Sequence, residues 1–341
     1  MVDVGDNAEI ANGGEIGAHA SAVSSVLRPC QQALTGMART GMGDAPEWNP
    51  PHPNGCCPAL RLRASVTAMQ FDYREIRAGG MIMRAAVLDC REQEPDGPPL
   101  LMLNGIGFNA ELMEPLAMAL AEPGPDAPKG RAVVIPEMPG CGGSPDPEQT
   151  LLMCSLSSVV TELMEALHPG RAFDCVGFSW GGALAQQIAV QSARRLTRLA
   201  LISTTSGMPL APANPNVLRR LIDPKEYVDP LRLSSNFHAL LAEGGANATL
   251  LRRFRTPSPQ GLGSQLLALT GWTAAPLLPF VRVPVALVGV ADDAIVPYLH
   301  HKMLGCLLPQ ATKIELASGG HLASLARPAN VSPALRAFLA G

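Results

Sequence analysis

Residues 173–189 read FDCVGFSWGGALAQQIA, an apolar run followed by small and apolar residues at helical spacing. The pattern predicts a buried strand, a sharp turn and a helix. Residues 177–181 fit Gly-x-Ser-x-Gly with Ser179 at the centre, and the two glycines remove side chains that would clash in so tight a turn. Such a turn lifts the Ser179 hydroxyl out of the sheet and points the helix N-terminus at negative charge forming beside it. The alternative is a structural turn with an incidental serine.

Strands and helices are expected to alternate on both sides of this stretch. Apolar or alternating runs predict strands within residues 65–80, 81–90, 100–107, 131–143, 196–205, 283–293 and 312–318, the first two joined by a Gly-Gly turn. Helical spacing occurs in residues 111–122, 153–168, 298–308 and 330–341. This alternation predicts an α/β fold with a mostly parallel sheet covered by helices on both faces.

Two parts of the chain break the alternation. Residues 1–60 are rich in Ala, Gly, Pro and Asn without a strand or helix period, so we expect a disordered extension, and methionines further on leave open a later natural start. Residues 207–281 hold helical patches and prolines, and they are too long for a crossover helix and too apolar for a linker. We therefore expect a helical cap at 207–281, inserted into a core of residues 64–206 and 282–341.

Composition excludes several classes of protein. The 341 residues are 47% hydrophobic and 16% charged, which suits a large buried core and not a disordered chain. The 26 basic and 29 acidic residues argue against nucleic acid as a partner. No apolar run reaches the roughly 18–20 residues of a membrane-spanning helix, and the acidic start lacks the basic residues of a secretory signal. We expect a cytoplasmic protein whose eight cysteines, never spaced as Cys-x-x-Cys, are reduced core thiols.

A serine hydroxyl is a poor nucleophile at neutral pH and needs a base, for which histidine has a suitable pKa. We predict that His321 is this base, because SGGHL follows the last expected strand, at the sheet edge where Ser179 is also expected. The other histidines fall in the extension, the cap or expected helices: His19, His52, His168, His238, His300 and His301. We expect one or both of the last two, in mid-helix, to be exposed to solvent.

The histidine needs a carboxylate to orient its ring, and the chain order serine, acid, histidine suits this arrangement of strands. The strand expected within 196–205 ends without an acid, so the acid is expected in VADDAIVP, after the next strand. We choose Asp293, which lies four residues before Pro297. The alternative is that Asp292 orients the histidine and Asp293 caps the following helix.

An oxyanion formed at Ser179 needs two hydrogen-bond donors. One is expected to be the backbone N–H of Trp180, directly after the nucleophile, and the other the N–H of Ile106 in LNGIGFN. Glycines on both sides of Ile106 allow the backbone to approach a substrate closely, although a plain tight turn remains the alternative. A second glycine-rich loop, residues 139–144, follows the next strand; it either lines the same mouth or, more simply, forms a turn. No glycine-rich loop has the lysine of a phosphate-binding loop.

Together these motifs resemble the α/β-hydrolase superfamily over residues 69–339, and within it the intracellular depolymerases of medium-chain-length poly(3-hydroxyalkanoates). In the core the resemblance is carried by PLLMLNGIGFNAEL (99–112), PEMPGCGGS (136–144), VGFSWGGALAQQIA (176–189), DDAIVP (292–297) and GGHL (319–322). In the cap it is carried by PKEYVDP (224–230) and LTGWTAAPLLP (269–279). The family's nucleophile, acid and base fall on Ser179, Asp293 and His321. This chain departs from the family at Val290, where a glycine is usual, and in the helix before Trp272, which has fewer aromatic residues.

The resemblance implies a serine hydrolase that cleaves ester bonds of this storage polyester inside the cell, through an acyl-enzyme on Ser179 and without a metal or other cofactor. Phe108, Leu266 and Trp272 are expected to contact the substrate. An apolar rim of the cap could also bind the surface of a storage granule. Two alternatives stay open: a soluble carboxylesterase or C–C bond hydrolase with a small substrate, and a non-catalytic granule-binding protein, against which the intact serine, acid and histidine argue.

Overall fold

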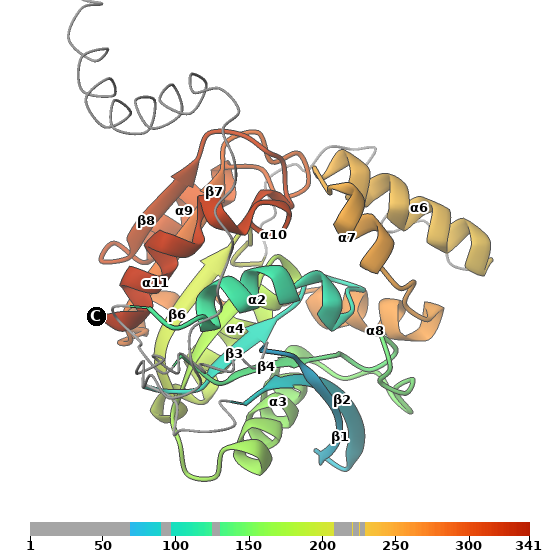
Figure 1. The fold of residues 1–341 in the computed structure, drawn as a ribbon, viewed down its shortest axis with the longest axis horizontal. Helices are drawn as coiled ribbons and strands as arrows, with labels where there is room; N and C mark the ends of the chain where they lie inside the picture. Colours follow the sequence, from blue (N-terminus) through green and yellow to red (C-terminus); the bar gives the residue numbers. More distant parts are fainter. Residues whose placement is uncertain (1–68, 90–96, 125–129, 208–219, 221–224, 226–228) are drawn as a thin grey trace, which may run out of the picture. The chain divides into compact units, whose positions relative to one another are not determined.

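One eight-stranded sheet, in the order β1-β2-β4-β3-β5-β6-β7-β8, runs through the part of the chain that the structure describes (Figure 1). The structure is a computed structural model, and it describes residues 69–89, 97–124, 130–207, 220, 225 and 229–341. The expected extension at 1–60 lies outside these residues. The described sheet confirms the predicted α/β class.

The first two strands form a hairpin at one edge of the sheet. Strands β1 (Asp72–Ala78) and β2 (Met81–Leu88) pair antiparallel, and β2 pairs antiparallel with β4 (Val133–Pro136). Gly79 and Gly80 join the first two strands with φ of 56° and 78°, values that glycine adopts without a steric penalty. The Gly-Gly turn predicted from the sequence is therefore confirmed.

The remaining pairs of neighbouring strands are parallel. They comprise β3 (Leu100–Leu103), β4, β5 (Phe173–Phe178), β6 (Leu196–Ile202), β7 (Val285–Val290) and β8 (Thr312–Leu316). Every residue of β3, β4, β5 and β7 is buried. Burial on both faces explains why these strands are almost entirely apolar and do not alternate with polar residues. The exception is Asp174 in β5, which is buried and pairs with Arg131.

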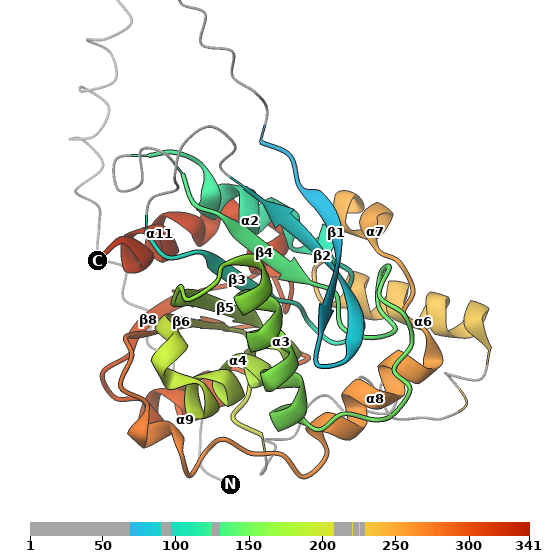
Figure 2. The same ribbon diagram turned by 90° about the horizontal axis from the view of Figure 1, so that it is seen from below.

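Helices cover the sheet on both sides, and each side has its own apolar cluster. On one side lie α3 (Met153–Leu167), α4 (Trp180–Gln191) and α9 (Leu299–Leu307). On the other lie α2 (Glu114–Ala121), α10 (Ala323–Ala326) and α11 (Ser332–Ala340). Figure 2 shows α2 and α11 on one side of the sheet and α3, α4 and α9 on the other. Short 3-10 helices complete the connections: η1 (Ala110–Leu112), η2 (Ala193–Arg195), η4 (Leu278–Phe280) and η5 (Pro328–Asn330).

Three further helices lie between β6 and β7 in the chain, within the interval predicted to form a cap. They are α6 (Pro230–Glu243), α7 (Ala248–Arg253) and α8 (Pro259–Leu269), and Figure 1 shows them grouped together at the right. Each is capped at its N-terminus by a polar side chain that accepts a backbone N–H of the first turn. The capping residues are Asp229, Asn247 and Ser258. Residues 208–219, 221–224 and 226–228 of this interval lie outside the described residues.

The expectation of core thiols is confirmed for Cys141 and Cys175, which are buried, and is wrong for Cys154 and Cys306. The latter two are exposed because each occupies the outer face of an amphipathic helix. The other four cysteines lie outside the described residues. The expectation that His300 or His301 is exposed was wrong, because both are buried, with 3% and 8% of their surface exposed. No helix of the described residues has the length and hydropathy needed to cross a membrane.

Candidate active site

Ser179 lies in the turn between β5 and α4, with φ of 52° and ψ of −118°. A positive φ is strained for a residue with a side chain, and such strain persists where surrounding contacts fix the backbone. Here the Ser179 N–H donates to the Ile202 carbonyl at 2.9 Å, and the Ser179 carbonyl accepts the Thr204 hydroxyl at 2.6 Å. The end of β6 therefore fixes the serine backbone on both sides.

Three glycines allow the close packing of this turn. A Cβ atom on Gly177 would lie 2.5 Å from the Gly181 carbonyl oxygen, and one on Gly182 would lie 2.5 Å from Cβ of Thr204. One on Gly181 would lie 2.3 Å from the Leu103 carbonyl oxygen at the end of β3. Real Cβ atoms do not approach so closely, so the predicted sharp turn requires glycine at these positions.

The structure brings the three predicted catalytic side chains together in one chain of hydrogen bonds. His321 Nε2 lies 2.9 Å from Ser179 Oγ, and His321 Nδ1 lies 2.7 Å from Asp293 Oδ2. Both His321 and Asp293 are buried, with 3% and 6% of their surface exposed. With the Nδ1 proton bonded to the carboxylate, Nε2 is free to accept the serine proton. This geometry suits a serine nucleophile with a histidine base.

The two neighbouring aspartates have different partners. The second oxygen of Asp293, Oδ1, accepts the N–H groups of Ile295 and Val296 at 2.9 and 2.8 Å, which fixes the carboxylate toward His321. Asp292 is exposed and accepts the N–H groups of Gly319 and Gly320 at 3.0 and 2.9 Å. Those donors hold the pKa of Asp292 below its usual range. Asp292 therefore fixes the loop that precedes His321 through two hydrogen bonds, and it does not bond to the imidazole.

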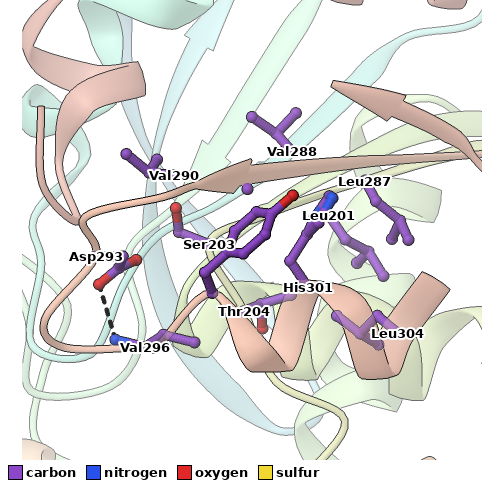
Figure 3. A pocket seen from close by; sticks show the side chains of 12 residues that line it. Leu201, Ser203, Thr204, Leu287, Val288, Val290, Asp293, Val296, His301 and Leu304 are labelled. Atoms are coloured by element: carbon purple, nitrogen blue, oxygen red, sulfur yellow. Dashed lines mark hydrogen bonds between the residues drawn. The ribbon is translucent and has the colours of Figure 1, made fainter. Parts of the chain in front are cut away.

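A small cavity lies behind Asp293, between the ends of β6 and β7 and helix α9. Figure 3 shows Asp293 bonded to the Val296 N–H at its edge, with Ser203 and His301 also lining it. Burial lowers the pKa of His301, which favours the uncharged form of the ring. A Cβ on Gly289 would lie 2.5 Å from Cγ of His301, so glycine at this position of β7 leaves room for the imidazole ring. His301 therefore lines the cavity behind Asp293, where its ring stacks on Tyr298.

The two predicted oxyanion donors lie at the same end of the sheet as Ser179. The N–H of Trp180 belongs to the first turn of α4, where the helix itself supplies no acceptor. Ile106 lies in a turn closed by a bond from the Phe108 N–H to the Gly105 carbonyl at 3.2 Å, and Gly107 has φ of 70°. Close packing of Gly181 on Leu103 brings the two segments together.

An apolar cavity opens beside Ser179 and His321. The other residues that line it are Ile106, Phe108, Phe237, Leu240, Leu241, Ile295 and Leu322. Of the predicted substrate contacts, Phe108 lines this cavity, whereas Leu266 and Trp272 do not. Leu266 packs half-buried against an apolar cluster, and the Trp272 indole N–H donates to Gln187 at 2.9 Å. The loop at residues 139–144 does not line the cavity either.

Sequence reasoning missed the contribution of α6 to this cavity. Phe237, Leu240 and Leu241 recur at the spacing of one helical face, and all three are buried. That spacing was visible in SNFHALLAE and predicts a helix, but it does not say which part of the core the helix covers. Among the described residues, no three His, Cys, Asp or Glu side chains are grouped so that they could hold a metal ion.

The fold and these residues define a class of hydrolase. The alpha/beta hydrolase fold family matches residues 98–328, and the chain belongs to this family. The chain is 30% identical to a poly(3-hydroxyalkanoate) depolymerase of Ectopseudomonas oleovorans, over 79% of this chain and 93% of the relative. It is also 32% identical to a pimeloyl-[acyl-carrier protein] methyl ester esterase of Aromatoleum aromaticum, over 68% of this chain and 94% of that protein. The resemblance seen in the sequence motifs is thereby confirmed.

Solved structures agree on the fold. An enol-lactonase from Burkholderia xenovorans LB400 superposes with a TM-score of 0.65 at 18% identity, covering 79% of this chain and all of the other. A hydrolase from Pseudomonas aeruginosa PA01 superposes with a TM-score of 0.63 at 22% identity, covering 79% and 99%. At these identities the likeness concerns the fold alone. The substrate has to be argued from the site.

Proposed function

We propose that the protein is a serine esterase that hydrolyses the ester bonds of medium-chain-length poly(3-hydroxyalkanoate). The observation that carries the proposal is the continuous chain of hydrogen bonds from Ser179 through His321 to Asp293, which ends at the apolar cavity. Similarity to the depolymerase of Ectopseudomonas oleovorans supports the choice of substrate.

In the proposed reaction, Ser179 Oγ attacks the ester carbonyl while His321 Nε2 takes the hydroxyl proton. The N–H groups of Ile106 and Trp180 stabilise the oxyanion of the tetrahedral intermediate. Its collapse breaks the ester bond, and His321 returns the proton to the leaving alkoxide, which departs as the free hydroxyl end of the polymer. Water, activated by His321, then attacks the 3-hydroxyacyl-enzyme in the same way and releases the acid.

The cavity supports an aliphatic substrate. Apart from Ser179 and His321, every residue that lines it is apolar, so an alkyl side chain gains the free energy of leaving water there. Exposed apolar side chains of the cap segment support contact with a polyester surface: Leu231, Leu267, Leu277 and Phe280. We accordingly propose that the enzyme acts in the cytoplasm at the surface of storage granules.

A second candidate is an esterase for a small substrate, or a C–C bond hydrolase with the same three side chains. The observation that favours it is the similarity to a pimeloyl-[acyl-carrier protein] methyl ester esterase, because the match extends over 94% of that relative's length.

Turnover of amorphous polyhydroxyoctanoate granules, measured beside p-nitrophenyl butyrate and octanoate, tests the proposal. We expect polymer hydrolysis by the wild type and its loss in Ser179→Ala, whereas Ser158→Ala in α3, whose hydroxyl bonds only within the helix layer, keeps it. Hydrolysis of the small esters without the polymer would select the second candidate. A serine-directed phosphonate is expected to label the peptide that contains Ser179 and no other.

A further inference from the structure

Gln265 of α8 joins three segments that surround the reacting serine. Its side chain is buried, with 3% exposed, and its Oε1 accepts the Gly107 N–H at 3.1 Å. Its Nε2 donates to the Cys141 sulfur at 2.9 Å, and its backbone carbonyl accepts the Trp180 indole N–H at 3.0 Å. One cap residue therefore holds both the loop that carries Ile106 and the residue that follows Ser179.

The bond to Gly107 fixes the turn in which Ile106 lies. The Gly105 carbonyl accepts the Phe108 N–H, so in a trans peptide the Ile106 N–H points the opposite way. The next peptide, between Ile106 and Gly107, can rotate by half a turn when a β-turn changes type, and this rotation changes ψ of Ile106. With φ of 70° at Gly107 the turn is of the type that needs glycine at its third position, and Gln265 Oε1 accepts the N–H of that rotating peptide.

The turn at Gly107 also packs against side chains of the cap interval. A Cβ on Gly107 would lie 2.9 Å from the Phe237 ring and 3.0 Å from Pro257, so residues of the cap interval pack directly onto the turn. The far end of the loop is held separately, because Asn109 donates to the Arg253 carbonyl and accepts the Arg255 N–H, each at 2.9 Å. Loss of the Gln265 bond would therefore release the turn without releasing the whole loop.

We propose that Gln265 is a positioning residue for the oxyanion hole, which makes the donor geometry at Ile106 depend on the seating of α8. The inference rests on the proposed function, because it assigns Ile106 a role in the reaction of Ser179. It adds that the cap takes part in transition-state stabilisation and does not only cover the substrate. The effect of Gln265 is then expected in kcat, since a misplaced donor weakens binding of the oxyanion and not of the ester.

The test compares Gln265→Met with Gln260→Met, a matched change on the same helix. Methionine at 265 keeps the volume and the backbone bond to Trp180 but loses the acceptor for Gly107. Gln260 is exposed and bonds the Pro147 carbonyl, so its loss weakens a contact between α8 and the core away from the turn. With p-nitrophenyl butyrate we expect kcat to fall about 10- to 100-fold in Gln265→Met with KM within about twofold. Gln260→Met is expected to keep both constants.

Two further measurements separate positioning from a general loss of stability. The affinity for a trifluoromethyl ketone, which adds Ser179 to form an oxyanion, is expected to fall in Gln265→Met by the same factor as kcat/KM. Exchange of the Gly107 amide hydrogen is expected to be slow in the wild type and in Gln260→Met, and faster in Gln265→Met. Unchanged kcat in a folded Gln265→Met, or equal losses in both variants, would overturn the proposal.

The amide exchange also separates this inference from the proposed function. A wild type that hydrolyses no ester would remove the proposed function, while protection of Gly107 would still report whether Gln265 holds the turn. If Gln265→Met does not fold, Gln265→Asn is the second variant, because its shorter side chain keeps an amide but falls short of Gly107. An Asn variant with wild-type kcat and wild-type protection of Gly107 would overturn the proposal equally.

Discussion

Gly181 lies so close to Leu103 that a Cβ atom on the glycine would be 2.3 Å from the leucine carbonyl oxygen. The first turn of α4 is therefore seated directly on the end of β3, where the loop with Ile106 begins. This contact sets the spacing between the two backbone segments that carry the proposed oxyanion donors. Glycine at position 181 thus serves the geometry of the site as well as the tightness of the turn.

Replacing Gly181 by alanine is expected to push α4 away from β3 and to destabilise the protein by more than about 2 kcal/mol, because backbone atoms and not a flexible side chain receive the new Cβ. Gly263→Ala in α8 is the control, since nothing lies within 4 Å of a Cβ there. Alanine favours a helix over glycine, so the control is expected to be neutral or stabilising by up to about 1 kcal/mol. Chemical denaturation measures both, and equal stabilities would contradict the expectation.

Asp293→Asn is expected to lower kcat by about a thousandfold or more, because an amide at this position no longer fixes the imidazole tautomer that accepts the serine proton. Asp292→Asn is expected to stay within about tenfold, because Asp292 contacts the loop before His321 and not the ring. Steady-state rates of the two variants on one ester show which aspartate orients His321. The opposite ranking would assign the acid to Asp292.

Asp292 also predicts a pH dependence of stability. Its pKa is lowered in the folded protein by the N–H groups of Gly319 and Gly320. The ionised carboxylate therefore stabilises the fold above its ordinary pKa of about 4, and the contribution is lost as the pH falls through the lowered folded value. Comparing the stability of wild type and Asp292→Asn at neutral and acid pH is expected to show a difference that shrinks below about pH 4. A difference that grows in acid would contradict this assignment.

Sequence reasoning reached the strands, the helices and the residues that meet at Ser179, because each depends on local patterns. Apolar runs predict the buried parallel strands, and glycines mark the turn where Gly181 packs on Leu103. It could not place Gln265, whose side chain reaches a turn more than a hundred residues away in the chain. The burial of His300 and His301 was likewise hidden, since it depends on how α9 packs on β7. Hydrophobic periodicity predicts helices and strands, but it does not predict contacts that arise only when those elements pack together.

Trp272→Ala is expected to lower the melting temperature and to reduce ester and polymer hydrolysis in parallel. The indole is half-buried against the apolar cluster of α3 and α4, donates to Gln187 and lies outside the cavity, so the structure favours a packing role. Trp272→Phe keeps an aromatic ring and loses the hydrogen bond to Gln187. Its melting temperature and its rates are expected to lie between those of the wild type and of Trp272→Ala. A variant that melts like the wild type and loses only polymer turnover would instead make Trp272 a substrate contact.

Leu240→Trp is expected to shorten the acyl chain that the enzyme accepts. Leu240 is buried at the wall of the cavity beside Ser179, and a larger side chain there removes space that a long alkyl chain would occupy. We expect the ratio of kcat/KM for p-nitrophenyl octanoate to that for the acetate to fall by about tenfold or more. Leu267→Trp is the matched control, because Leu267 is 57% exposed on α8 and does not line the cavity. If both variants keep the wild-type ratio, the cavity lined by α6 does not bind the acyl chain, and the proposed substrate loses its main structural support.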